Sequence, residues 1–304
     1  MNIFRYYNQN KKSIWIAIIA IIILIIAIQT INNIVKNRQE NKENIIKINE
    51  SEYRNNLNIN VLLTEEDVKE DVTLIIDQFI RYCNAGKIEE AYALLSEDCK
   101  QEMFPTLQYF KQNYVDIYFF ETKLYSKEKY RNQTYKIKLY NDIISTGKVE
   151  DTIEDYYTIQ KENNIIKLNI SNYIGKKTLN KNNRDNDLRI VVLNKRIYKD
   201  YEKYEIEIEN LTYKTILLDT KSSTKTMYLV GKNNVQYYSL SHEVLTENLV
   251  VKPKATIKVF IKYTKEYNSN QTVYKLCFSD IVTDYDLYKI NKNNVNKKVM
   301  EVSL

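Results

Sequence analysis

An uncharged, strongly apolar run from Ser13 to Val35 constrains this chain more than any other part of its sequence. Its first part, Ile14–Ile28, consists almost wholly of isoleucine, alanine and leucine. About 20 such residues in a helix cross the hydrocarbon core of a bilayer. The run therefore predicts a membrane-spanning helix, and the rest of the chain must supply any water-soluble fold.

The apolar run also fits the core of a signal peptide, but the residues after it do not favour cleavage. Gln29–Asn33 holds no pair of small residues of the kind that signal peptidase recognises, and no cysteine follows directly. We expect an uncleaved signal anchor, with a cleaved signal peptide and a buried soluble helix as the alternatives. The lysine and arginine residues on the two sides do not decide its orientation. The short N-terminal tail favours a cytoplasmic N-terminus and exported domains.

Composition and charge exclude several classes of function. The chain carries a net charge of +6, but it has no basic stripe with interleaved aromatic residues of the kind that nucleic-acid binding requires. The four glycines leave no phosphate-binding loop. Isoleucine, lysine, asparagine and tyrosine dominate, which we interpret as the mark of a low-GC bacterial genome.

We expect the chain to fall into an α+β domain and an all-β domain behind the anchor. The predicted parts are a cytoplasmic tail at 1–12, the transmembrane anchor at 13–35, a juxtamembrane stalk at 36–63, the α+β domain at 64–175, a linker at 176–187, the all-β domain at 188–290 and a C-terminal tail at 291–304. The linker is predicted because 180–187 is polar and shows no apolar pattern.

The α+β domain is predicted from a change of period along the chain. Apolar residues from Val68 to Cys83 recur at helical spacing, and Gly86 supplies a stop signal. Two further helices follow, with Ser96 and Thr106 near helix starts. Strands are then expected at 117–125, 134–143, 154–160 and 165–170.

The segment from Gly86 to Ser96, set between a helix and the predicted sheet, resembles the nuclear-transport-factor-two-like (cystatin-like cone) superfamily. That resemblance implies helices that cover a strongly bent sheet around a cone-shaped cavity. It also brings in a family of isomerases, dehydratases and cyclases that use Asp, His or Tyr in that cavity, although a fold does not imply a function.

The all-β domain is predicted from short alternating segments separated by turns. Strands are expected at 188–193, 204–209, 215–218, 227–230, 235–240, 256–263 and 273–278, with a hairpin turn at 231–234. This number of short strands is typical of a β-sandwich. The order of Asn210, Gly231, the Tyr237-Tyr238 pair, Pro253 and Phe260 resembles bacterial immunoglobulin-like domains of exported and membrane-anchored proteins.

Few residues are candidates for chemistry. The only histidine, His242, lies in the all-β part and is expected at the surface. Asp77, Glu121 and Asp155 are the carboxylates that would reach a cone cavity, where burial would raise their pKa. Asp77 borders the apolar stripe of its helix and is expected to face water. We therefore predict no catalytic, cofactor-binding or metal-binding residues and no cofactor.

The cysteine and aromatic residues are expected to have structural roles, and for each group the sequence leaves one alternative open. Cys83, Cys99 and Cys277 are expected to be buried and apolar in character, and a Cys83–Cys99 disulfide stays open. Aromatic residues at 118–125 and 237–238 are expected to pack in cores. An exposed platform for a peptide or glycan is the alternative.

These observations favour a non-enzymatic, single-pass membrane protein of the bacterial cell envelope. It would present two extracytoplasmic domains for protein binding or assembly. Its expected partners are the lipid bilayer, through the N-terminal helix, and envelope or membrane proteins, with no nucleic acid. The alternatives are a scaffold subunit of a conjugation or type IV secretion-like machine, a small-ligand-binding or enzymatic cone domain, and a glycan- or wall-binding module.

Overall fold

The computed structural model describes residues 70–141, 152–223, 225–267 and 272–304. The anchor and stalk predicted at 13–63 lie outside these residues, as does the predicted start of the first helix at Thr64. Across the described ranges, no helix has both the length and the apolar character needed to cross a bilayer. The described part is α+β, and its three sheets are built from antiparallel pairs.

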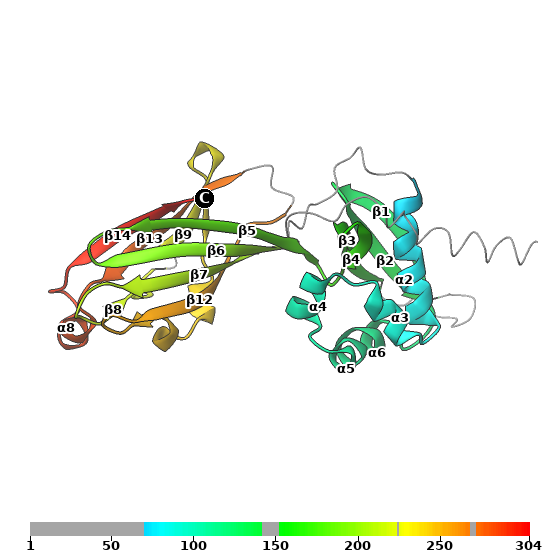
Figure 1. Ribbon diagram of the computed structural model, residues 1–304, viewed down its shortest axis with the longest axis horizontal. Helices are drawn as coiled ribbons and strands as arrows, with labels where there is room; N and C mark the ends of the chain where they lie inside the picture. The colour runs from blue at the N-terminus through cyan, green and yellow to red at the C-terminus, as the bar shows by residue number, and fades with distance from the viewer. Residues whose placement is uncertain (1–69, 142–151, 224, 268–271) are drawn as a thin grey trace, which may run out of the picture. The chain divides into compact units, whose positions relative to one another are not determined.

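The helix–sheet region comprises the elements from residue 70 to residue 169. Its helical elements are η2 (Glu70–Thr73), α2 (Leu74–Asn84), α3 (Ile88–Ala93), α4 (Glu97–Met103), α5 (Leu107–Phe110), the π-helical turn η3 (Lys111–Val115) and α6 (Asp116–Tyr118). Its sheet has the order β1 (Lys123–Arg131), β2 (Thr134–Asn141), β3 (Ile153–Glu162) and β4 (Ile165–Asn169). Figure 1 shows α2 lying against this sheet.

The predicted helices in this region are confirmed where they fall within the described residues. Ile76, Phe79 and Cys83 form the buried stripe of α2, and Gly86 follows the helix with a φ of 66°. Ser96 begins α4 by accepting a hydrogen bond from the Cys99 N–H at 2.9 Å. Such a cap satisfies an N–H group that the helix itself leaves without a partner.

The strand predicted at 117–125 is wrong in its first half. The helical chain continues through α6 to Tyr118, and β1 begins only at Lys123. The π-helical turn η3 holds one residue more than an α-helical turn, and both Tyr114 and Phe119 are buried. The apolar residues around 117–125 look continuous in the sequence, but the structure divides them between a helix end and a loop. Sequence period alone does not show such a break.

The two-sheet region comprises the strands from residue 173 to the C-terminus. One sheet has the order β12 (Thr256–Tyr263), β7 (Glu202–Asn210), β6 (Leu188–Tyr198) and β5 (Tyr173–Arg184). The other has the order β10 (Gln236–Tyr238), β9 (Met227–Gly231), β13 (Val273–Val282), β8 (Ile216–Leu217) and β11 (Val250–Val251), and β14 (Lys297–Ser303) also pairs with β13. Short helical turns, η4 (Lys232–Asn234), η5 (Ser241–Glu243), η6 (Thr246–Leu249) and α8 (Tyr285–Ile290), connect them.

The predicted pattern of the central strands is confirmed. Tyr204, Ile206 and Ile208 of β7 are fully buried, and β12 has the predicted bounds. Leucine, isoleucine and valine side chains from both sheets meet in one shared core. The 231–234 turn joins the antiparallel pair β9–β10, with Asn233 and Asn234 at positive φ.

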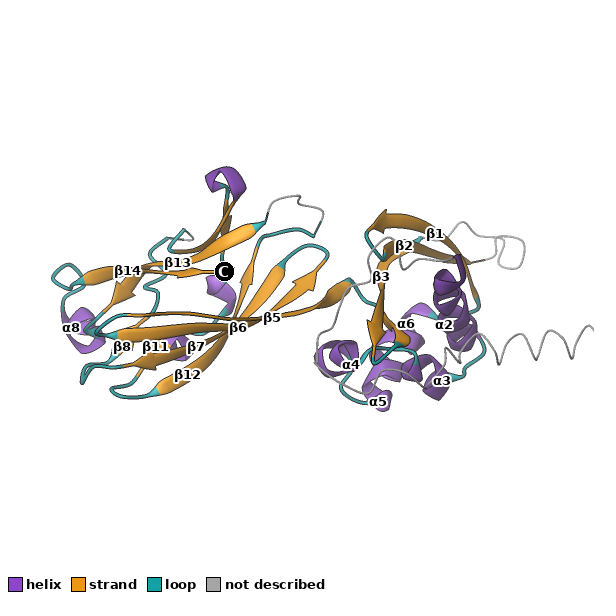
Figure 2. Ribbon diagram, turned by 45° about the horizontal axis from the view of Figure 1, so that its top comes forward, coloured by secondary structure: helices purple, strands orange, loops and turns teal. Residues whose placement is uncertain are grey.

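Two segments expected to lack secondary structure are strands. Residues 176–184 of the predicted linker belong to β5, which pairs with β6 from Tyr173 to Arg184 with two register shifts (Figure 2). Their side chains are mostly exposed, so pairing by the backbone leaves no apolar pattern in the sequence. Residues 297–303 of the predicted C-terminal tail form β14, which buries Met300 and Val302. Strand β5 therefore forms by backbone pairing where the sequence looks polar, whereas β14 alternates buried and exposed residues over a short stretch.

Strands β5 and β6 take part in two hydrophobic cores. Tyr173 of β5 and Tyr198 of β6 pack in the core of the helix–sheet region, with ring centroids 5.3 Å apart, and Tyr201 stacks on Tyr198. At the other end of β6, Leu188 and Ile190 pack in the core of the two-sheet region, and Leu179 of β5 packs against that core. Glu102 of α4 adds hydrogen-bonded ion pairs to Arg196 and Lys203. The two cores are therefore built partly from the same pair of strands.

Candidate functional site

The three carboxylates singled out in the sequence do not converge on one site. Asp77 accepts a hydrogen bond from the Tyr125 hydroxyl and pairs with Lys127 Nζ at 2.8 Å. It is thus partly buried and paired, where a free position facing water was expected. Glu121 is exposed and accepts from Asn141 Nδ2 at 3.0 Å. Only Asp155 is buried in the way a catalytic carboxylate would be.

Asp155 lies on β3 at the centre of a buried hydrogen-bond network. Its Oδ2 accepts from the Tyr114 hydroxyl at 2.8 Å, and that hydroxyl lies 2.6 Å from the hydroxyl of Tyr157. The backbone N–H groups of Tyr156 and Asn172 donate to Oδ1 at 2.6 and 2.9 Å, and that of Ser171 donates to Oδ2 at 3.1 Å. The carboxylate therefore has four donors for its two oxygens.

This geometry fits a structural role for Asp155. A carboxylate offers about four lone-pair positions, and the four donors occupy them. Ser171 and Asn172, which form the turn between β4 and β5, have φ values of 59° and 61°, a conformation that L-residues adopt at a cost. The carboxylate holds this turn in place. It leaves no acceptor position pointing towards a substrate.

Burial raises the pKa of Asp155 to about 6, and the hydrogen bonds from Tyr114 and from the backbone oppose this rise only in part. The Tyr114 and Tyr157 hydroxyls allow the network to take up the proton, because either can be the donor between them. When Asp155 is protonated, Tyr114 accepts its proton in a hydrogen bond and donates to Tyr157. The direction of this shift is the one that burial of a carboxyl group implies.

We expect Asp155 to make the protein more stable in mild acid. A group whose folded pKa lies above its unfolded value contributes stability below the unfolded pKa, which is lost as pH rises through the folded pKa. For a rise from 3.8 to about 6, the loss is about 3 kcal/mol between roughly pH 4 and pH 7. The measurement is the free energy of unfolding against pH. The Asp155→Asn variant should lack this part of the slope, and an unchanged slope would contradict the assignment.

A second buried ionic group lies in the two-sheet region. Glu202 of β7 is 1% exposed and pairs with Lys195 Nζ at 3.1 Å and Lys265 Nζ at 2.9 Å. The Tyr204 hydroxyl donates to the same carboxylate at 2.7 Å. Although burial raises it, the two ammonium groups hold the pKa of Glu202 below its usual value. The carboxylate is fully partnered inside the protein, as Asp155 is.

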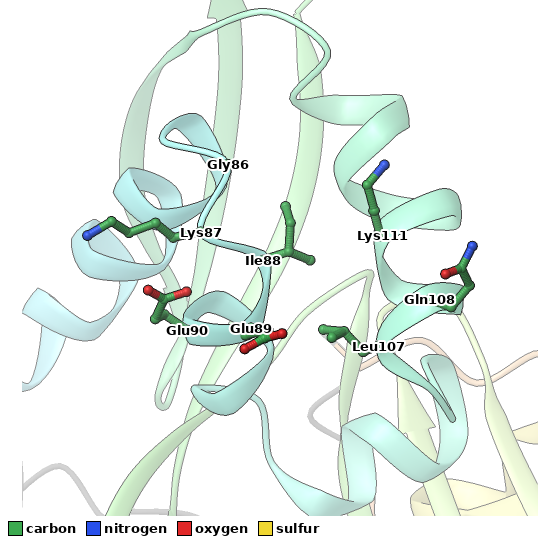
Figure 3. Close-up of a pocket in the computed structure, with 8 residues that line it drawn as sticks. All are labelled: Gly86, Lys87, Ile88, Glu89, Glu90, Leu107, Gln108 and Lys111. Carbon is green, nitrogen blue, oxygen red and sulfur yellow. The ribbon is translucent and has the colours of Figure 1, made fainter.

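A shallow hollow lies between the end of α2, α3 and α5 (Figure 3). Its volume is about 460 Å³, and Ile88 and Leu107 supply its apolar part. Figure 3 shows Lys87 extending away from Lys111, so the two ammonium groups do not converge on a shared anion site. Glu89 and Glu90 add charges of the opposite sign. The hollow has the mixed charge of an ordinary surface depression.

A groove of about 790 Å³ lies beside β12. One wall is β12 itself, from Ile257 to Phe260, and the other is the segment from Glu243 to Asn248 together with Val250. Leu245 is 68% exposed and Phe260 is 46% exposed. The groove therefore combines accessible apolar side chains with an edge strand, since β12 pairs only with β7 in its sheet.

Part of the free edge of β12 is already paired by the chain. The Leu240 N–H donates to the Lys262 carbonyl at 2.8 Å, and the Thr264 N–H donates to the Tyr238 carbonyl at 3.0 Å. After Leu240 the chain turns away into η5. In an antiparallel ladder, backbone groups that point to one edge recur at every second residue. Phe260 and Lys258 therefore present their N–H and C=O groups to the open part of the edge.

Sequence reasoning missed this groove. The strand at 256–263 was predicted with its inward residues, but its place at the edge of a sheet depends on long-range pairing. One signal was available: Phe260 occupies an outward position of the alternating pattern, between Lys258 and Lys262. A single exposed aromatic residue is common on protein surfaces, and the Arg196 guanidinium lies over this ring, 5.4 Å from its centroid, so the signal is weak.

Metal and thiol sites have no support within the described residues. No group of three or more His, Cys, Asp or Glu side chains is arranged to hold a metal ion there. His242 is exposed, as expected. Cys83, Cys99 and Cys277 are free and buried, also as expected, and the structure does not join Cys83 to Cys99.

No protein-family model matches this chain, and no curated protein or solved structure is significantly similar to it. The resemblances drawn from sequence pattern therefore stay predictions. The arguments about function depend on the side chains described above.

Proposed function

We propose that this chain is a non-enzymatic, membrane-anchored protein of the bacterial cell envelope that binds other proteins through its folded part. The observation that carries the proposal is the groove beside β12, where apolar side chains lie next to an incompletely paired strand edge. Exposed apolar surface of this kind is typical of protein–protein contact. The uncharged run from Ser13 to Val35 supplies the anchor in this proposal.

The finer assignment of folds belongs to the same proposal. We propose a nuclear-transport-factor-two-like region at 64–175 and an immunoglobulin-like region at 188–290. The helices against a four-stranded antiparallel sheet support the first, and the two sheets around one core support the second. The shared use of β5 and β6 by both cores is a feature that neither resemblance predicts.

The buried carboxylates favour binding over catalysis. A general base needs an acceptor position open to the proton that it removes. Asp155 and Glu202 have all their described oxygens engaged by donors within the chain. An enzymatic use of a cone cavity through Asp155 would require its network to open.

We expect the full-length protein to sediment with membranes and to resist extraction by alkaline carbonate, because an uncharged apolar run as long as Ser13–Val35 is proposed to anchor it in the bilayer. A variant lacking 13–35 should appear in the soluble fraction if it is expressed in the cytoplasm. Protease added to intact spheroplasts should digest the folded part if it is exported. Recovery of full-length protein in the soluble fraction would contradict the anchor.

The binding part of the proposal is tested by crosslinking and affinity isolation of the tagged protein from its own membranes. A defined set of envelope proteins should be recovered, and their identity would distinguish a general binding protein from a subunit of a secretion machine. Recovery of the same proteins with an unrelated single-pass control would contradict specific binding.

A further inference from the structure

We propose that the groove beside β12 binds an extended peptide segment of a partner protein, in which apolar and basic side chains alternate, by adding a strand to the β12 edge. This inference rests on the proposed protein-binding function and names the chemistry of the partner. Three independent observations carry it: the open backbone groups, the apolar walls and the uncompensated negative charge.

The backbone provides the first observation. The segment Tyr238–Leu240 already runs antiparallel to β12 and pairs with its last residues. It departs at Leu240, so the edge stays open along Lys258 and Phe260. A peptide that continues the same line would complete the ladder towards Thr256. Addition of a strand to an exposed edge gains main-chain hydrogen bonds that do not depend on the peptide's sequence.

The side chains around the edge provide the second observation. Ile257 and Val259 of β12 face Val244, Leu245 and Val250 across the groove. An added strand places every second side chain on this inner side. Those side chains would be apolar, because they would cover Leu245 and the partly buried valines. The groove also lies where both sheets end, at β12 and at β11, so the added strand would close the gap between two sheet edges.

Charge provides the third observation and fixes the class of partner. Two of the three charged residues that line the groove are paired within the chain, since Lys258 pairs with Glu205 at 3.1 Å and Glu243 pairs with Lys262 at 2.8 Å. Glu247 lines the groove, is exposed, and forms no ion pair with any other residue that the structure describes. The unpaired charge is negative, so the alternate side chains of the peptide would be lysine or arginine.

The test uses full-length protein in detergent and a fluorescent peptide of about eight residues that alternates valine and lysine. The control peptide carries glutamate in place of each lysine. We expect the basic peptide to bind and the acidic peptide not to bind. Hydrogen exchange of the backbone amides in 256–261 should slow when the basic peptide is added, and the amides of α2 should not change.

Two surface variants, each with a matched control, test which side chains of the groove contact the peptide, and neither changes a core residue. Glu247→Lys should weaken binding of the basic peptide about tenfold, whereas Glu89→Lys, an equal change of charge at an exposed site on α3, should leave it unchanged. Leu245→Ser should also weaken binding, and its matched control is Ile290→Ser, at a residue that is 84% exposed. These pairs separate local contact from a general effect of charge or apolarity.

Several outcomes would overturn the inference. They are equal binding of the two peptides, no binding of the basic peptide, protection outside 256–261 only, and equal effects of Glu247→Lys and Glu89→Lys. Co-isolation of envelope proteins that persists in the Glu247→Lys and Leu245→Ser variants would leave the proposed function intact while removing this site from it. If the protein were found in the soluble fraction and still bound the basic peptide specifically, the peptide site would stand and the proposed membrane anchor would fail.

Discussion

Replacing Asp155 with alanine is expected to lower the free energy of unfolding by about 4 kcal/mol. The change removes the acceptor for three backbone N–H groups, the buried one of Tyr156 and the partly buried ones of Ser171 and Asn172. Each buried donor left without a partner costs about 1–3 kcal/mol. The Tyr114 hydroxyl loses less, because the Tyr157 hydroxyl remains 2.6 Å away. Chemical denaturation of the purified full-length protein, followed by circular dichroism, measures the change.

The matched control is Glu121→Ala, which removes an exposed carboxylate from the same region and should change the free energy of unfolding by less than about 0.5 kcal/mol. Equal effects of the two substitutions would contradict the role of Asp155 in holding the β4–β5 turn. Asp155→Asn keeps the size of the side chain but turns one acceptor into a donor that faces an N–H group. It therefore separates the cost of losing an acceptor from the cost of losing the volume of the side chain.

Replacing Glu202 with alanine is expected to cost about 3–5 kcal/mol. The substitution leaves Lys195 and Lys265 with no carboxylate between them, and Lys265 is only 6% exposed. An ammonium group that stays charged and buried without a partner is strongly unfavourable. Thermal and chemical unfolding should both report the loss. Glu202→Gln keeps the contact with the Tyr204 hydroxyl and should fall between the wild type and the alanine variant.

The control for Glu202 lies on the same strand. Glu209 pairs with Arg189 at 3.6 Å in an exposed position, so Glu209→Ala should cost less than about 1 kcal/mol. Because the pKa of Glu202 is lowered in the folded protein, its contribution is present above its unfolded pKa and is lost as pH falls through its folded pKa. Its pH dependence thus has the opposite sign to that of Asp155. A difference in stability between the wild type and Glu202→Ala that grows as pH falls through the folded pKa of Glu202 would contradict the assignment.

Local sequence pattern predicted those elements whose side chains alternate between core and solvent. The α2 stripe of Ile76, Phe79 and Cys83 and the β7 stripe of Tyr204, Ile206 and Ile208 are clear because burial selects the residues. Strand β5 was missed for the opposite reason. From Lys176 to Arg184 its side chains stay largely exposed, and backbone pairing with β6 runs along this stretch. A strand of this kind has no hydrophobic period to detect.

The candidate sites were predictable to a smaller extent. Asp155 was identified as a carboxylate on a strand, and the rise in its pKa follows from burial. Its four donors come from α5–η3, from β3 and from the turn after β4, so their convergence depends on tertiary packing. The same holds for the groove, whose walls lie on β12 and on a loop that is close to it only in the folded chain.

The sharing of β5 and β6 between two cores has a consequence for how the chain matures during synthesis. Tyr173, Tyr198 and Tyr201 complete the first core, yet they are made after every helix and strand of the helix–sheet region. A nascent chain that ends before them exposes the apolar side chains that these rings cover. The helix–sheet region therefore reaches its final packing only once the β5–β6 hairpin has left the ribosome, and folding of the first region waits on the beginning of the second.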